Sequence, residues 1–199
     1  MNLYRKEETE IMNSPDRKLI LEDGSEYIGY HFGSQDERVC EIVFNTSMVG
    51  YQEILSDPSY TDQMVVMTYP LIGNYGITDE DFESKLLSIG GMIVRDYNDM
   101  PSNFRYTQTL SEVMEENHIP GIYGIDTREL TRSIRDLGSR RGIMTDISTT
   151  LEEGLAKIKA TPVPHDAVSR VMVCTYRKPP FQCRSHRLWN ENEHCTFPK

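Results

Sequence analysis

The sequence predicts a mixed α/β fold, with one compact domain of about 160 residues inside a chain of 199 residues. Three observations support this fold class. Short apolar runs typical of strands dominate the first half of the chain, capped helical patterns follow in the second half, and no repeat or low-complexity tract interrupts them. This length suits one domain, or one domain plus a fragment of another, and a hydrophobic content of 38% is enough for a core.

The predicted strands are short apolar runs bounded by turn-forming residues. The first two form a hairpin, because Asp23-Gly24 lies between them and this dipeptide favours a tight turn. Cys40 lies inside the third run and is expected to be a buried structural thiol. The predicted strands span residues 19–21, 26–30, 39–44, 64–69 and 91–94.

Helices are predicted where a capping residue precedes apolar residues at helical spacing. A short helix over residues 51–55 is expected to stop at Asp57-Pro58. Three longer helices are expected to open at Thr109, Asp126 and Thr150. The inner faces of the last two are expected to consist of Leu130, Ile134 and Leu137 in one and of Leu151, Leu155 and Ile158 in the other.

Both ends are expected to lie outside the domain, which is placed at residues 18–160. Residues 1–17 are charged and aperiodic, and a flexible extension is predicted for them. Residues 161–199 are interpreted as a linker and an aberrant tail, which holds three of the four cysteines. The tail contains no pair of cysteines with two to four residues between them, the spacing typical of zinc ligands, so no metal site is expected there.

Composition argues against several classes of function. The net charge of −10 disfavours nucleic-acid binding, since phosphate recognition needs a basic surface. No apolar run approaches the roughly 20 residues that span a bilayer, and the N-terminus lacks the apolar segment of a signal peptide. No membrane association is therefore expected, and the cytoplasm is the expected compartment.

Residues 44–76, FNTSMVGYQEILSDPSYTDQMVVMTYPLIGNYG, are the most informative segment. The segment carries few charges but many polar side chains and turn-forming residues, as is typical of surfaces that contact another molecule. Within it, Asn45-Thr46-Ser47 follows a predicted strand, where short polar side chains bind a ligand or cap the next helix. The residues alone favour the cap. Gly73 and Gly76 are expected to permit positive φ or the close approach of another backbone.

A second informative segment is residues 124–132, GIDTRELTR. Asp126 is expected to cap a helix that starts at Thr127. Arg128 and Arg132 then lie one turn apart on one face of that helix. This pair forms either a solvated stripe or a surface that contacts a partner.

These segments resemble the N-terminal domain of the small, glutamine-hydrolysing subunit of carbamoyl phosphate synthetase. The resemblance covers about residues 19–146 and includes three shorter pieces, LEDG at 21–24, VRD at 94–96 and PSNFR at 101–105. It implies a swivelling β/β/α domain. It also implies a parent ligase that makes carbamoyl phosphate from glutamine, bicarbonate and ATP for arginine and pyrimidine synthesis.

The resemblance also implies roles for individual residues. Ser47 would bind glutamine in the complete subunit, beside the glutaminase domain, instead of capping a helix. The large subunit would be the partner, and it would hold the ATP and Mg sites, so no cofactor and no catalytic residue is expected in this chain. The interface with the large subunit would include Tyr51, Gln52, Tyr69, Asn74, Arg128 and Arg132.

The sequence lacks the family's glutaminase motifs. That half of the subunit carries a cysteine nucleophile in a Gly-x-Cys-x-Gly turn, and no cysteine here has this context. A one-base shift in the codons of residues 187–196 permits D-F-G-M-K-M-N-I-V-R, close to the family's D-F-G-x-K-x-N-I-L-R. A frameshifted tail is therefore expected, with genuine divergence as the alternative. The chain alone is predicted to dock the large subunit without hydrolysing glutamine; the alternative function is a stand-alone, non-catalytic binding module.

Overall fold

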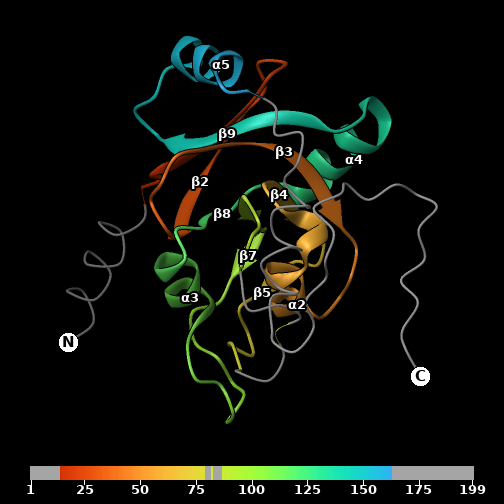
Figure 1. Cartoon of the computed structure of the whole chain (residues 1–199), viewed down its shortest axis with the longest axis vertical. Helices are drawn as coiled ribbons and strands as arrows, with labels where there is room; N and C mark the ends of the chain where they lie inside the picture. The colour runs from red at the N-terminus through yellow and green to blue at the C-terminus, as the bar shows by residue number, and fades with distance from the viewer. Residues whose placement is uncertain (1–13, 79–81, 83–86, 163–199) are drawn as a thin grey trace, which may run out of the picture.

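The computed structural model describes residues 14–78, 82 and 87–162, and within them the mixed α/β fold is confirmed. Figure 1 shows the strands at the centre of the domain and the helices around them. The strands are β1 (Arg17–Leu21), β2 (Glu26–Gly33), β3 (Arg38–Asn45), β4 (Gln63–Met67), β5 (Leu71–Ile72), β6 (Gly91–Ile93), β7 (Asp96–Tyr97), β8 (Pro120–Tyr123) and β9 (Arg140–Asp146). The helices are α2 (Tyr51–Ser56), the 3₁₀ turn η1 (Pro58–Tyr60), α3 (Leu110–Glu116), α4 (Thr127–Leu137) and α5 (Leu151–Ala160).

Seven of the strands form one closed sheet in the order β1-β2-β8-β6-β4-β3-β9, and β9 returns to pair with β1. The pairs β3–β4, β4–β6 and β6–β8 are parallel, whereas the other four pairs are antiparallel. β5 and β7 form a separate two-stranded parallel sheet. The parallel half of the closed sheet therefore has the carboxyl ends of β4, β6 and β8 at one edge.

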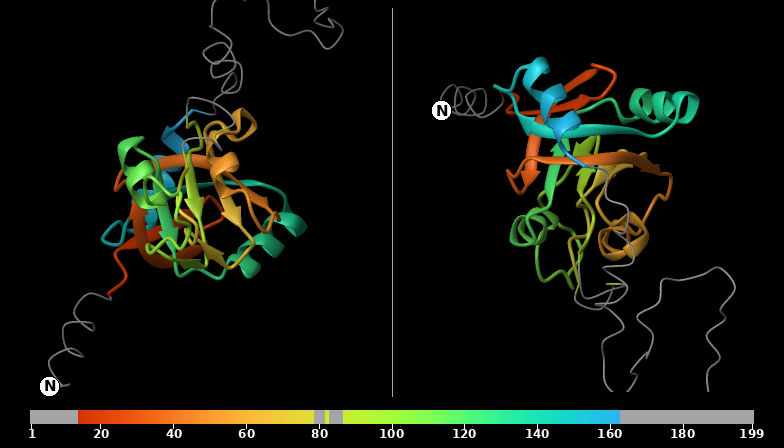
Figure 2. Two further views of the ribbon diagram at one scale, coloured as in Figure 1. Left: turned by 90° about the horizontal axis from the view of Figure 1, so that it is seen from below. Right: turned by 45° about the horizontal axis from the view of Figure 1, so that its top comes forward.

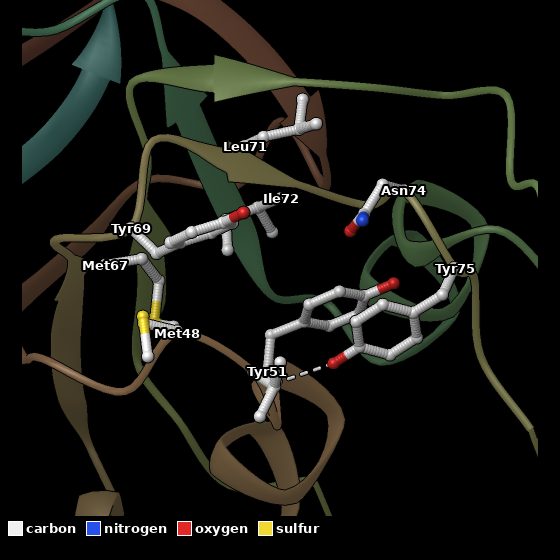
Figure 3. Close-up of a pocket in the computed structure, with 9 residues that line it drawn as sticks. Met48, Tyr51, Met67, Tyr69, Leu71, Ile72, Asn74 and Tyr75 are labelled. Atoms are coloured by element: carbon white, nitrogen blue, oxygen red, sulfur yellow. Dashed lines mark hydrogen bonds between the residues drawn. The ribbon is translucent and has the colours of Figure 1, made fainter.

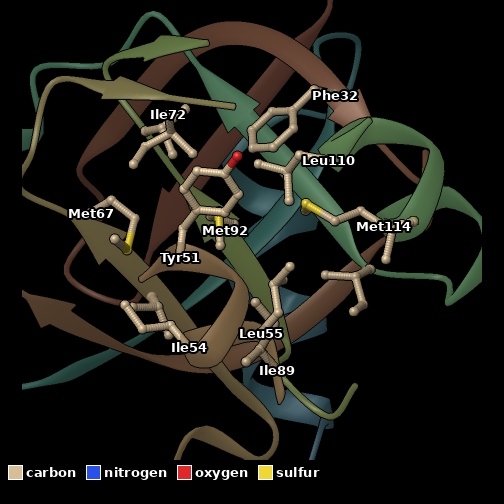
Figure 4. Close-up of a cluster of buried hydrophobic side chains, with 14 of the residues drawn as sticks. Phe32, Tyr51, Ile54, Leu55, Met67, Ile72, Ile89, Met92, Leu110 and Met114 are labelled. Carbon is tan, nitrogen blue, oxygen red and sulfur yellow. The ribbon is translucent and has the colours of Figure 1, made fainter. Parts of the chain in front are cut away.

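Side-chain alternation along each strand divides the core between the two faces of the sheet. In β4, Met64 and Val66 join an inner cluster that α4 also contacts, whereas Val65 and Met67 join an outer cluster with α2 and α3. Figure 4 shows that outer cluster, with Tyr51 at its centre. A third, small cluster lies under α5 and consists of Ile20, Ile143 and Ile158.

The hairpin and the strands predicted in the first half of the chain are confirmed. β1 and β2 pair antiparallel, and the turn between them has Gly24 at φ 89°. β4 ends at Met67, two residues earlier than expected, since the chain turns before Pro70. Cys40 is free and buried as expected, and burial raises the pKa of its thiol to about 12.

The helix starts are also confirmed. Thr109 and Thr150 each cap their helix in a reciprocal box with the glutamate three residues later. The Asp126 carboxylate accepts hydrogen bonds from the N–H groups of Arg128 and Glu129, both at 3.0 Å. In α4 the reciprocal box is not formed, because no hydrogen bond from the Asp126 N–H to the Glu129 carboxylate is present among the described residues.

Two predictions about inner helix faces are wrong. Leu137 is 72% exposed and Leu151 is 36% exposed, although both have the apolar spacing of a buried stripe. Each is the terminal residue of its helix. Figure 2 shows that the end of α4 projects beyond the edge of the sheet. Ile134 is still buried in the inner cluster, whereas Leu137, three residues further along, is exposed.

β1 begins at Arg17, the last residue of the segment interpreted as an extension. Arg17 is buried and donates hydrogen bonds to the carbonyls of Gln35 and Asp36. Residues 1–13 and 163–199 lie outside the described residues, so the extension and the tail with Cys174, Cys183 and Cys195 are not described further. Every helix in the described part of the chain is too short or too polar to cross a membrane.

Candidate functional site

The start of α2 is held by a tyrosine from another part of the chain. The Tyr75 hydroxyl accepts hydrogen bonds from the N–H groups of Gly50 at 3.0 Å and Tyr51 at 3.1 Å (Figure 3). Gly50, with φ 89°, is the residue that precedes the helix, and it has no side chain that could cap the helix. The cap interpretation of Ser47 is therefore wrong, because Gly50 precedes the helix and no side chain caps it. The Tyr75 hydroxyl instead accepts from the first helical N–H group, that of Tyr51.

Ser47 itself is exposed in the loop between β3 and α2. Its N–H donates to the Asn45 side-chain oxygen at 2.7 Å, which forms a local turn. The two residues after it, Met48 and Val49, are each 73% exposed. The loop thus presents a hydroxyl beside two apolar side chains to the outside.

Tyr51 and Gln52 are interior residues, each 1% exposed. The Tyr51 ring stacks on Tyr75 with centroids 4.1 Å apart, and its hydroxyl donates to the Gly76 carbonyl at 2.8 Å. The Gln52 amide donates to the Thr78 carbonyl and accepts from the Thr78 N–H at 3.0 Å. Gln52 supports the surface from below, whereas Tyr51, although almost fully buried, also contributes to the lining of the pocket above it.

A shallow pocket of about 70 Å³ lies above these side chains (Figure 3). Its lining is apolar and aromatic, with one amide from Asn74, as in surfaces that bind other proteins. It has no side chain that could serve as a strong nucleophile or general base. The lining residues are Met48, Val49, Tyr51, Met67, Tyr69, Leu71, Ile72, Asn74 and Tyr75.

The turn beside this pocket depends on glycine. Gly73 and Gly76 have φ values of 91° and 70°, so the expectation of positive φ is confirmed at both. A Cβ atom at Gly73 would also collide with the Asn98 carbonyl oxygen. The backbone that approaches Gly73 closely is therefore that of the loop at Asn98 in the same chain.

A second, basic groove of about 270 Å³ lies on the other side of the segment 68–71. Thr68 and Pro70 line this groove, whereas Tyr69 and Leu71 line the shallow pocket, so alternate side chains serve the two sites. The groove is lined by Thr68, Pro70, Arg95, Thr127, Arg128, Thr131 and Arg132.

The structure thus divides the predicted contact residues into three groups. Tyr51, Tyr69 and Asn74 line the shallow pocket, Arg128 and Arg132 lie at the basic groove, and Gln52 lies beneath the surface. The residues themselves did not single out Arg95. Its signal was the Val-Arg-Asp sequence directly after a predicted strand, where a side chain emerges at the edge of the sheet.

Among the described residues, no group of three or more His, Cys, Asp or Glu side chains is placed to hold a metal ion. The arrangement offers two neighbouring surfaces, one apolar and one cationic.

Comparison with known proteins assigns a family to most of the chain. The family model described as the carbamoyl-phosphate synthase small chain, CPSase domain, matches residues 19–144. The chain is 54% identical over 155 residues to the carbamoyl phosphate synthase small chain of Fusobacterium nucleatum and 50% identical over 159 residues to that of Staphylococcus epidermidis. It is 52% identical over 155 residues to the pyrimidine-specific small chain of Halalkalibacterium halodurans.

These matches cover 78–80% of this chain but only 43% of each relative. The chain therefore spans less than half the length of the curated relatives that it matches.

Proposed function

Because this chain belongs to the carbamoyl-phosphate synthase small chain family through its CPSase domain, we propose that it docks onto the large subunit of glutamine-dependent carbamoyl phosphate synthetase. The observation that carries this proposal is the pair of adjoining surfaces on either side of residues 68–71, one apolar and one cationic. Interfaces combine these elements, with apolar and aromatic residues at the centre and arginine beside them.

In the complete small subunit, a glutaminase half would release ammonia from glutamine, and the large subunit would use the ammonia to make carbamoyl phosphate for arginine and pyrimidine synthesis. ATP and Mg²⁺ would bind to the large subunit, and this domain would hold no cofactor. This domain would give structural support to the glutaminase half and to the large subunit, and no residue in it is proposed as catalytic.

We also propose the finer fold class, the swivelling β/β/α domain, and a cytoplasmic location. The closed mixed sheet with helices on its faces supports the first proposal. Kinship with the small chain family supports both. Nucleic acid and membrane are not proposed as partners, given the net charge of −10 and the lack of long apolar runs.

A stand-alone binding module is the second candidate function. It is favoured by one observation, that the residues lining both pockets include no nucleophile paired with a base. Such a module would keep the interface with the large subunit but would not support glutamine hydrolysis.

Two measurements on the purified chain test the main proposal. Calorimetric titration with the large subunit should give saturable binding, and a glutaminase assay should give no ammonia, because the sequence lacks the nucleophile context and catalysis falls by many orders of magnitude without the nucleophile and its base. Absence of binding at high micromolar concentration would contradict the docking proposal. Glutamine turnover that a thiol-blocking reagent abolishes would contradict the proposal that glutamine is hydrolysed by the glutaminase half and not by this domain.

Ser47→Ala separates the proposed glutamine contact from a structural role. The Ser47 side chain is exposed and caps no helix, so the free energy of unfolding should change by less than about 0.5 kcal/mol. In the complete small subunit, the variant should raise the KM for glutamine and leave ammonia-dependent synthesis unchanged. Denaturation curves and steady-state kinetics measure the two effects, and an unchanged glutamine KM would remove Ser47 from the proposed site.

A further inference from the structure

We propose that the basic groove between residues 68–70, Arg95 and α4 receives a carboxylate-bearing, acidic segment of the large subunit. The inference rests on the proposed docking function and adds to it the chemistry of one contact and a residue, Arg95, that was not expected there. Three arginines and the hydroxyl-bearing Thr68, Thr127 and Thr131 line this groove.

The topology brings these residues together at one edge of the sheet. Thr68 directly follows β4, and Arg95 lies two residues after the end of β6, which is parallel to β4. β8 is parallel to β6, and the chain after it leads into α4, which supplies Arg128 and Arg132. The groove therefore lies at the carboxyl edge of parallel strands, a common position for recognition sites in α/β proteins.

The groove arginines form few close ion pairs within the described residues, although the Asp126 carboxylate interacts electrostatically with Arg95 and Arg128. Arg128 and Arg132 are exposed, lie four residues apart on one helix face and form no ion pair with any described residue. Arg135, one turn further along, is instead paired with Asp136 at 2.8 Å. Arg95 has its Nε 4.0 Å from the Asp96 carboxylate and also interacts electrostatically with Asp126. In a chain with net charge −10, this cationic surface is a local exception.

One polar atom of the groove also lacks a partner. The Thr131 hydroxyl oxygen is buried and makes no hydrogen bond with the described residues. A buried polar group without a partner costs about 1–3 kcal/mol. Thr131 is one of the residues that line the groove.

The hydrogen bonds at the start of α4 favour a protein segment over a small anion as the ligand of the groove. Its first N–H groups would favour a phosphate, but the Asp126 carboxylate already accepts from those of Arg128 and Glu129. The groove thus offers side-chain donors only, in an open site where water weakens each ion pair to about 0–1 kcal/mol. A protein partner that covers the groove excludes that water, and guanidinium–carboxylate pairs then become specific contacts.

The test is a calorimetric titration of the large subunit with the full chain and with three charge-reversed variants, Arg95→Glu, Arg128→Glu and Arg132→Glu. Lys159→Glu is the matched control, since Lys159 is exposed on α5 and the substitution changes the net charge by the same amount. Each groove variant should weaken the Kd by about tenfold or more, whereas the control should stay within about twofold. The unchanged chain should lose affinity as salt is raised, and the groove variants should lose less.

Far-UV circular dichroism and the thermal midpoint verify that each variant is folded, and Arg128→Gln and Arg132→Gln replace any variant that is not. Equal affinities for groove variants and control, with the unchanged chain bound, would overturn the inference but leave the docking function standing. No binding by the unchanged chain would overturn both. Saturable binding of inorganic phosphate to the chain alone, lost in Arg128→Glu, would assign the groove to a small anion and overturn the acidic segment as its ligand.

Discussion

Tyr51→Ala is expected to lower the free energy of unfolding by about 3–5 kcal/mol. Tyr51 is 1% exposed, lies in the outer core cluster, stacks on Tyr75 and donates to the Gly76 carbonyl. Its removal leaves a cavity, breaks a buried hydrogen bond and frees the ring that holds the start of α2. Urea denaturation monitored by circular dichroism measures the loss.

Tyr51→Phe is the matched control, because it removes only the hydroxyl. It should cost about 1 kcal/mol, the usual net value of one hydrogen bond. If Tyr51→Ala cost no more than Tyr51→Phe, the stacked ring would contribute little, and the shallow pocket would not depend on this side chain. In the docking titration, Tyr51→Ala should also weaken binding, since Tyr51, Tyr75 and Asn74 line the same pocket.

Leu130→Ala is expected to destabilise the domain by about 2–5 kcal/mol. Leu130 is fully buried in the inner cluster, where α4 packs against the sheet. Leu137 on the same helix is 72% exposed, so Leu137→Ala should change stability by no more than about 0.5 kcal/mol. The same denaturation experiment compares the two leucines directly.

Similar losses for both leucines would mean that the last turn of α4 is packed in solution. That result would contradict the arrangement in which the helix projects beyond the sheet. Because α4 also carries Arg128 and Arg132, Leu130→Ala separates the positioning of the helix from its charges: affinity should fall while the salt dependence of binding persists.

Local signals predicted much of the fold. The Asp23-Gly24 turn, the threonine caps and the apolar runs of β3, β4 and β6 act over a few residues, and each is present where expected. β8 and β9 were missed because Pro120, Gly121, Arg140 and Arg141 obscure their apolar pattern. These strands are fixed by neighbours distant in the chain, Tyr30–Gly33 for β8 and both β1 and β3 for β9.

The candidate site was less predictable for the same reason. Nothing near Gly50 in the sequence indicates that the Tyr75 hydroxyl binds the start of α2, since the two residues lie 25 positions apart. Arg95 reaches the groove only because β4 and β6 are parallel neighbours. The polar composition of residues 44–76 suggested exposure, yet Tyr51 and Gln52 are buried, because aromatic and amide groups can satisfy their hydrogen bonds inside.

The closed order of the sheet has a consequence for synthesis on the ribosome. β1 needs β9 as its second neighbour, and these strands lie near opposite ends of the domain. Until residues up to Asp146 have left the exit tunnel, a nascent chain exposes the free edges of β1 and β3, which can pair with other chains. Folding of this domain therefore cannot be completed before Asp146 has emerged, and stalling before that point would leave an intermediate with unpaired strand edges that is prone to aggregate.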